Sequence, residues 1–162
     1  MYTAQLPDMG PFVIRYPRGR GEQEDWKCPM KEIPVGKGRC LKEGTDVAVL
    51  SLGPIGNHVT QAIHELASQD ISIAHYDMRF LKPIDEDILS YVGTHFSRII
   101  TVEDGVKNGG LGSAVLEYMA DHDLHPAVTR LGLPDSFVEH GTPEELYKIV
   151  GLDVESIKKA IL

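Results

Sequence analysis

The sequence predicts an α/β fold, a three-layer α/β/α sandwich around a mostly parallel sheet of about five strands, one of them an antiparallel edge strand. Two observations support this. Short apolar runs typical of buried strands alternate with longer segments whose apolar residues recur at helical spacing. Such alternation is typical of right-handed βαβ crossovers, which place helices on both faces of a parallel sheet. In addition, the length of 162 residues suits one ordinary domain.

The strands are expected where apolar runs end at turn residues. The first is short and is turned by Glu43 and Gly44, so we expect it to pair antiparallel at an edge of the sheet. The second, of sequence DVAVLSL, reads as a buried strand and is ended by Gly53 and Pro54. The expected strands are residues 36–42, 46–52, 71–78, 98–102 and 127–131.

Five helices are expected from apolar spacing and from capping residues. Asp85 can cap the second, because a carboxylate accepts backbone N–H groups at a helix start. Thr142, Pro143 and the acids after them form a strong start signal for the fourth. The expected helices are residues 57–69, 85–96, 111–122, one that begins at residues 142–145, and 153–161.

Residues 1–31 do not follow this alternation of strands and helices. Residues 11–16 (PFVIRY) have the composition of a single strand, which Pro17 ends, and the polar residues 19–31 read as a linker. A strand needs a sheet, and no second strand precedes this one. We therefore expect residues 1–31 to be the tail of a preceding domain with its linker, and residues 32–162 to form the α/β domain.

Charge and cysteine content restrict the partners. The net charge is −8 and no Lys/Arg-rich run exists, which disfavours nucleic acid and anionic membrane surfaces as partners. No apolar run is long enough to span a membrane, and the first residues do not read as a signal peptide. Cys28 and Cys40 form neither a zinc knuckle nor a redox pair, so a reducing cytoplasm is the simplest compartment.

The densest positive cluster is Arg15, Arg18 and Arg20 around Pro17. Guanidinium groups bind phosphate oxygens through two hydrogen bonds, and the proline reduces the entropy lost on binding. This cluster is a candidate site for a small phosphorylated ligand. The alternative is that it is only the solvated start of the linker.

Three further patterns could belong to functional sites, but structural roles are the more common explanation for such residues. Residues 107–113 (KNGGLGS) lie between a strand and a helix, where a phosphate could bind, but a tight turn with close helix packing is favoured. Glu103 and Asp104 could bind magnesium or act in acid–base chemistry, although a capping role is the more common one. His122 and His125 form only a weak metal signal.

Together, these segments resemble the 1-deoxy-D-xylulose-5-phosphate synthase family near its C-terminal end. The resemblance spans essentially the whole chain and implies the third, α/β domain of a transketolase-type enzyme, which packs in a homodimer. The matching segments, in order, are IRYPRG at 14–19, GKG at 36–38, DMRFLKPID at 77–85, TVED at 101–104, GGLGSA at 109–114 and GLPDSFVEHG at 132–141.

The resemblance implies a reaction that joins pyruvate, after decarboxylation, to D-glyceraldehyde 3-phosphate. Thiamine diphosphate and Mg²⁺ would be bound by domains outside this chain, and residues 1–31 would end the preceding pyrimidine-binding domain. Arg18 matches the arginine that holds the substrate's phosphate, and no catalytic residue can be carried over. Transketolases and the β-subunits of 2-oxoacid dehydrogenase E1 components resemble the chain less well. A standalone assembly or anion-binding module is a further alternative.

Overall fold

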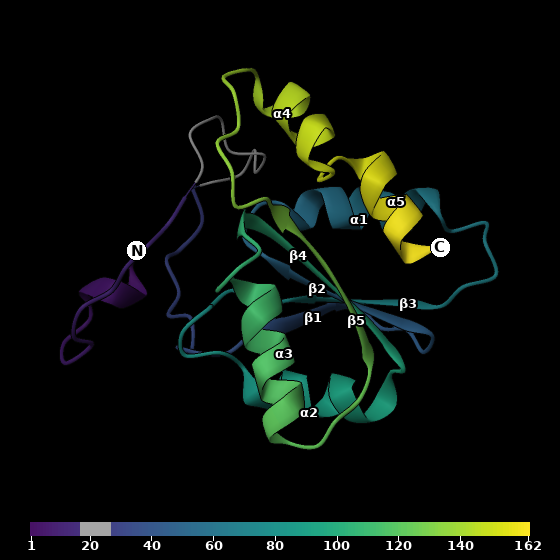
Figure 1. Cartoon of the computed structure of the whole chain (residues 1–162). Helices are drawn as coiled ribbons and strands as arrows, with labels where there is room; N and C mark the ends of the chain where they lie inside the picture. The colour runs from purple at the N-terminus through teal and green to yellow at the C-terminus, as the bar shows by residue number, and fades with distance from the viewer. Residues whose placement is uncertain (17–26) are drawn as a thin grey trace. The chain divides into compact units, whose positions relative to one another are not determined.

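The computed structural model describes residues 1–16 and 27–162, and the chain divides into two units, Met1–Val35 and Gly36–Leu162. The first unit contains a single turn of 3-10 helix, η1 (Thr3–Gln5), followed by extended chain (Figure 1). Thr3 is buried, and its hydroxyl oxygen accepts a hydrogen bond from the backbone N–H of Ile33 at 2.9 Å. This bond ties the two ends of the unit together.

The strand predicted for residues 11–16 is wrong. The segment contains no strand, and Val13 is 99% exposed. The sequence has the β-branched and aromatic composition of a strand, but a strand forms only when another strand pairs with its backbone. Among the described residues of this unit, no strand is present to pair with it.

The second unit contains the predicted sheet. Five strands run in the order β1-β3-β2-β4-β5. β1 pairs antiparallel with β3, and the pairs β2–β3, β2–β4 and β4–β5 are parallel. The elements are β1 (Arg39–Lys42), β2 (Val47–Leu52), α1 (Gly56–Glu65), β3 (Ile73–Asp77), α2 (Glu86–His95), β4 (Arg98–Val106), α3 (Leu111–Asp121), β5 (Ala127–Leu133), α4 (Pro143–Val150) and α5 (Val154–Ile161).

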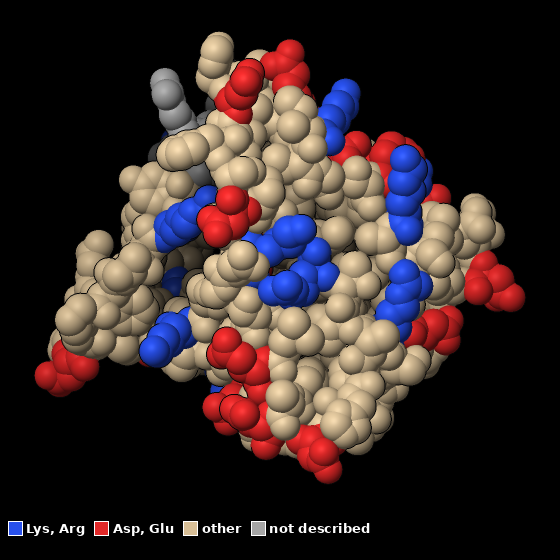
Figure 2. Space-filling model, viewed as in Figure 1, with Lys and Arg blue, Asp and Glu red and all other residues tan. Residues whose placement is uncertain are grey.

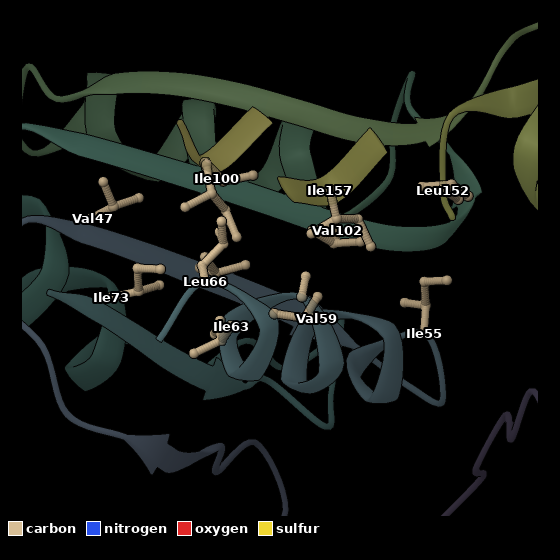
Figure 3. Close-up of a cluster of buried hydrophobic side chains, with 13 residues drawn as sticks. Val47, Ile55, Val59, Ile63, Leu66, Ile73, Ile100, Val102, Leu152 and Ile157 are labelled. Atoms are coloured by element: carbon tan, nitrogen blue, oxygen red, sulfur yellow. The ribbon is translucent and has the colours of Figure 1, made fainter. Parts of the chain in front are cut away.

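Helices cover both faces of the sheet, as the alternating pattern predicts. Figure 1 shows α1 and α5 on one face and α2 and α3 on the other. Because strand side chains alternate between faces, Val47 and Val49 of β2 join the core under α1 and α5. Ala48 and Leu50 join the core under α2 and α3. Figure 3 shows the first core, in which Val59 of α1 and Ile157 of α5 meet strand residues.

Local signals set several helix starts. The Asp85 side chain accepts from the N–H groups of Asp87 at 3.1 Å and Ile88 at 3.3 Å, which confirms the predicted cap of α2. Thr142 and Glu145 form a reciprocal capping box at the start of α4. The helix then ends at Gly151 in the left-handed conformation.

Two strands are longer than predicted. β4 continues beyond Val102 to Val106, and β5 continues to Leu133. The pairing of β4 with β5 is irregular between Val102 and Val106. This stretch holds Glu103, Asp104 and Gly105, whose composition reads as a loop. It is paired nonetheless, and it brings both acids to the carboxyl edge of the sheet.

Candidate functional site

The carboxyl ends of β2 and β4 form the topological switch point of the sheet. From β2 the chain crosses to β3 on one side, and β4 lies on the other side of β2. In open α/β sheets, ligands bind in the crevice outside the strand ends at such a point. The glycine turn at residues 107–113 and the Glu103–Asp104 pair both lie here, after and within the last part of β4. The sequence therefore located the region of interest.

Glu103 is a buried cap of α3. Its side chain is 4% exposed. One carboxylate oxygen accepts the N–H of Leu111 at 2.8 Å, and the other accepts the N–H of Gly112 at 3.0 Å. These donors are otherwise unsatisfied at a helix start, where the helix dipole also favours a negative charge. The capping interpretation of Glu103 is therefore confirmed.

The glycine turn is held by its own side chains. The Ser113 hydroxyl accepts the N–H of Gly109 at 2.9 Å and donates to the carbonyl of Lys107 at 3.0 Å. The Arg130 guanidinium of β5 donates to the same carbonyl at 3.1 Å. A Cβ placed on Gly112 would lie 2.6 Å from Cδ of Arg130, so glycine allows this close approach. The favoured interpretation, a tight turn with close packing, is confirmed.

α4 and the segment that joins it to α5 contact the end of β4 and the start of α1. The Tyr147 hydroxyl donates to Asp104 at 3.2 Å. Asp104, like Glu103, is therefore hydrogen-bonded to another residue of the chain. His58 of α1 is hydrogen-bonded to the carbonyl of Leu152 at 3.0 Å and packs edge-to-face on Tyr147, with ring centroids 5.2 Å apart. Leu152 is fully buried in the same core as Ile55 and Val59 (Figure 3).

A buried serine–histidine pair, which sequence reasoning missed, lies inside the sheet. Ser51 Oγ and His75 Nε2 are 2.8 Å apart, and His75 Nδ1 is 3.4 Å from the Thr60 hydroxyl. Burial lowers the pKa of His75 to about 4. The Ser51 and His75 side chains are 0% and 1% exposed, so substrate has no access and the pair joins β2 to β3. A histidine in a strand carries no sequence signal for such a partner.

Charged residues of the segment 77–85 and of β1 pair within the same unit. Arg39 Nε of β1 lies 3.0 Å from Asp77, which also accepts the N–H of Arg79 at 3.1 Å. Asp85 accepts the N–H of Gly38 at 2.8 Å, and Lys37 bridges Asp85 and Asp87. These pairs hold β1 against the end of β3 and the start of α2.

A shallow hollow of about 450 Å³ lies beyond the end of β5, lined by residues that include Lys107, Gly132, Phe137 and Ile149. Phe137 and Ile149 are strongly exposed. Figure 2 shows basic side chains gathered between α3 and β5 on the same face. The hollow is open, and its mostly apolar lining includes one basic residue, Lys107, and one acidic residue, Glu139.

The predicted phosphate-binding residue Arg18 lies outside the described residues, as does Arg20, and Arg15 is exposed. His122 and His125 each contact a different neighbouring side chain. His122 stacks on Tyr118 with centroids 3.9 Å apart, whereas His125 pairs with Asp123 at 3.2 Å. Within residues 1–16 and 27–162, no three His, Cys, Asp or Glu side chains could hold a metal ion together.

Comparison with known proteins gives the family. The sequence model of the transketolase C-terminal domain matches residues 36–157. The chain belongs to this family. A solved split-gene transketolase, described as an inactive β4 tetramer, superimposes with a TM-score of 0.74 at 33% identity, over 81% of this chain and 43% of that one. No helix in the described part of the chain is long and apolar enough to cross a membrane.

Two of the similar bacterial proteins match the whole chain, including the arginine segment that precedes the family domain. The 1-deoxy-D-xylulose-5-phosphate synthase of Bacteroides thetaiotaomicron is 61% identical over 100% of this chain and 25% of its own length. The synthase of Phocaeicola vulgatus is 60% identical over 100% of this chain and 26% of its own. The synthase of Syntrophotalea carbinolica is 40% identical over 94% of this chain and 24% of its own length. The chain thus spans about a quarter of the length of these relatives.

Proposed function

We propose that this chain is the C-terminal domain of a thiamine-diphosphate-dependent 1-deoxy-D-xylulose-5-phosphate synthase. The observation that supports this is the 61% identity to such a synthase over the full chain, because it extends beyond the family domain at 36–157 into the arginine segment. Residues 1–31 would be the tail of the preceding pyrimidine-binding domain with its linker, and residues 32–162 the transketolase C-terminal domain.

The parent enzyme would join pyruvate, after decarboxylation, to D-glyceraldehyde 3-phosphate, and its product would serve isoprenoid, thiamine and pyridoxal synthesis. Thiamine diphosphate supplies the electron sink for such chemistry. The described residues do not fit this cofactor: the α3 N-terminus carries the Glu103 carboxylate, and the Asp104 carboxylate accepts from Tyr147. We therefore place thiamine diphosphate and Mg²⁺ in other domains of the protein.

Arg18 would bind the phosphate of the glyceraldehyde 3-phosphate. A guanidinium can donate two parallel hydrogen bonds to phosphate oxygens, and Pro17 limits the freedom of the backbone beside it. Binding at the phosphate, remote from the reacting aldehyde, orients the aldehyde for attack. The arginine would thus act in positioning the substrate.

The α/β domain itself would act in support and assembly, as part of a cytoplasmic homodimer. Around its switch point, Glu103, Tyr147 and Leu152 are each hydrogen-bonded to other residues of the chain, and we place the reaction of the substrate in the other domains. The split-gene transketolase neighbour is described as inactive, which supports the proposal that this chain has no turnover by itself.

A chimeric enzyme tests this function. In it, this chain replaces the segment of the Bacteroides thetaiotaomicron synthase that it matches. The chimera is expected to form 1-deoxy-D-xylulose 5-phosphate from pyruvate and glyceraldehyde 3-phosphate, and a version truncated before the segment is the negative control. A folded, dimeric chimera without activity would contradict the proposal.

The same experiment separates the alternatives. An E1 β-subunit domain would transfer to a lipoyl group, which has no phosphate for Arg18 to hold, and a transketolase would use a ketose donor. Transfer by the chimera to a lipoyl acceptor would favour the E1 β-subunit. Activity of the chimera with a ketose donor would favour a transketolase. A standalone anion-binding module predicts phosphate binding by the isolated chain that survives Arg18→Ala, measured by calorimetry.

A further inference from the structure

The start of α3 has the features of an anion site. The helix has 11 residues and begins directly outside the carboxyl end of β4. Its first N–H groups, from Leu111 and Gly112, point at one carboxylate, that of Glu103, at 2.8 and 3.0 Å. Free N–H groups and the positive end of the helix dipole bind phosphates and carboxylates in many α/β proteins. Here the chain supplies the anion itself.

The surrounding residues leave room for an anion of carboxylate size. A Cβ on Gly110 would lie 2.2 Å from Oε2 of Glu103, and one on Gly132 would lie 3.1 Å from its Cγ. Glycine at these positions is therefore what admits the carboxylate. Any side chain at Gly110 would take its space.

A second observation points to a polar ligand at this place. The Thr101 hydroxyl is fully buried and has no hydrogen-bond partner among the described residues. It lies 2.8 Å from the position that a Cβ on Gly112 would occupy, so it faces the residue that binds Glu103. A buried polar atom without a partner is uncommon, and here it adds an unused hydrogen-bonding group beside the two N–H donors.

We propose that Glu103 is an internal ligand, occupying a carboxylate-sized anion site that the fold builds from the N-terminus of α3. The site is closed to a substrate or cofactor phosphate in the native chain, and removal of the side chain opens it to a small carboxylate such as formate. This inference does not depend on the synthase reaction proposed above, because it concerns the α/β domain alone.

Thermal unfolding of the 162-residue chain tests the proposal with Glu103→Ala. The variant is expected to melt below the native chain, and sodium formate is expected to raise its melting temperature by several degrees more than sodium chloride at equal ionic strength. Neutral formamide should give no such rise. The native chain and Glu117→Ala, which removes an exposed acid from the same helix, should respond to formate only as they respond to chloride.

Glu103→Gln keeps the side-chain volume and separates anion binding from loss of packing. It should be destabilised but gain nothing from formate, since the site stays filled. If Glu103→Ala does not fold in any buffer, the proposal is tested by the amide NMR signals of Leu111 and Gly112 in Glu103→Gln. We expect both signals to shift relative to those of the native chain. Equal effects of formate and chloride on a folded Glu103→Ala, or unchanged amide signals in Glu103→Gln, would overturn the proposal.

Discussion

At the residue scale, the buried His75 makes the stability of the domain depend on pH. Burial, opposed by the charge of Asp77 and assisted by that of Arg39, lowers the pKa of His75 from 6.5 to about 4. Between these two values the unfolded chain binds the proton and the folded chain does not. Stability is therefore full above pH 6.5 and falls as the pH drops toward 4, by at most about 3 kcal/mol from this group.

The His75 prediction is checked by urea unfolding of the native chain and of His75→Gln at pH 7 and at pH 4.5. The variant is expected to be less stable at pH 7, because Ser51 loses its partner, but to lose less stability on acidification. His125→Gln, which changes an exposed histidine, should behave as the native chain does. Equal acid sensitivity of all three proteins would contradict the assignment.

Gly110 is the position in the α3 turn least able to accept a side chain. A Cβ there would lie 2.2 Å from Glu103 and 2.5 Å from the carbonyl oxygen of Val106, and a backbone carbonyl cannot move aside cheaply. Gly110→Ala should lower the free energy of unfolding by about 3 kcal/mol or more. Gly109→Ala has open space around it and a φ of +77°, so backbone strain alone should cost about 1 kcal/mol. Chemical denaturation of both variants compares them.

At the element scale, Asp85 connects two elements, whereas Thr142 serves only one. The Asp85 carboxylate caps α2 and also accepts the N–H of Gly38 beside β1, and it is 4% exposed. Asp85→Ala should cost about 2–4 kcal/mol, because three donors lose their acceptor. Thr142→Ala removes an exposed cap from α4 and should cost about 1 kcal/mol. Urea unfolding of both variants tests this order. A lower unfolding midpoint for Thr142→Ala than for Asp85→Ala would contradict it.

The elements of the second unit were predictable because their signals are local. Apolar periodicity and caps such as Asp85 and Thr142 lie within the segments that they specify. The end of β4 was not predictable, because Glu103 and Asp104 read as loop residues and gain their roles from partners on α3 and α4. The strand prediction for residues 11–16 failed for the opposite reason: their composition is strand-like, but the described residues of their unit contain no strand to pair with them.

At the scale of the whole molecule, the groups around the switch point of the α/β domain are hydrogen-bonded to one another. Glu103 caps the start of α3, Tyr147 of α4 contacts Asp104 of β4, and Leu152 in the α4–α5 connection contacts His58 of α1. The sequence identified the glycine turn and the Glu103–Asp104 pair, but their contacts depend on residues far apart in the chain, such as Tyr147 with Asp104. A domain built this way suits a supporting role in a larger enzyme.

The isolated chain is accordingly expected to form no 1-deoxy-D-xylulose 5-phosphate from pyruvate and glyceraldehyde 3-phosphate, even with thiamine diphosphate and Mg²⁺ added. The reason is that the cofactor would be held by domains outside this chain, and the chimera assayed in parallel is the positive control. Product formed by the isolated chain above the rate of a heat-denatured sample would contradict this expectation.

The measurement that tests the central claim most directly is the KM for glyceraldehyde 3-phosphate in the chimeric synthase carrying Arg18→Ala. Loss of a charged hydrogen-bonding partner of the phosphate should raise this KM about tenfold or more, with little change in the KM for pyruvate. Arg20→Ala, in the same segment, is the matched control and should leave both values near those of the chimera. An unchanged KM for glyceraldehyde 3-phosphate in Arg18→Ala would contradict the account.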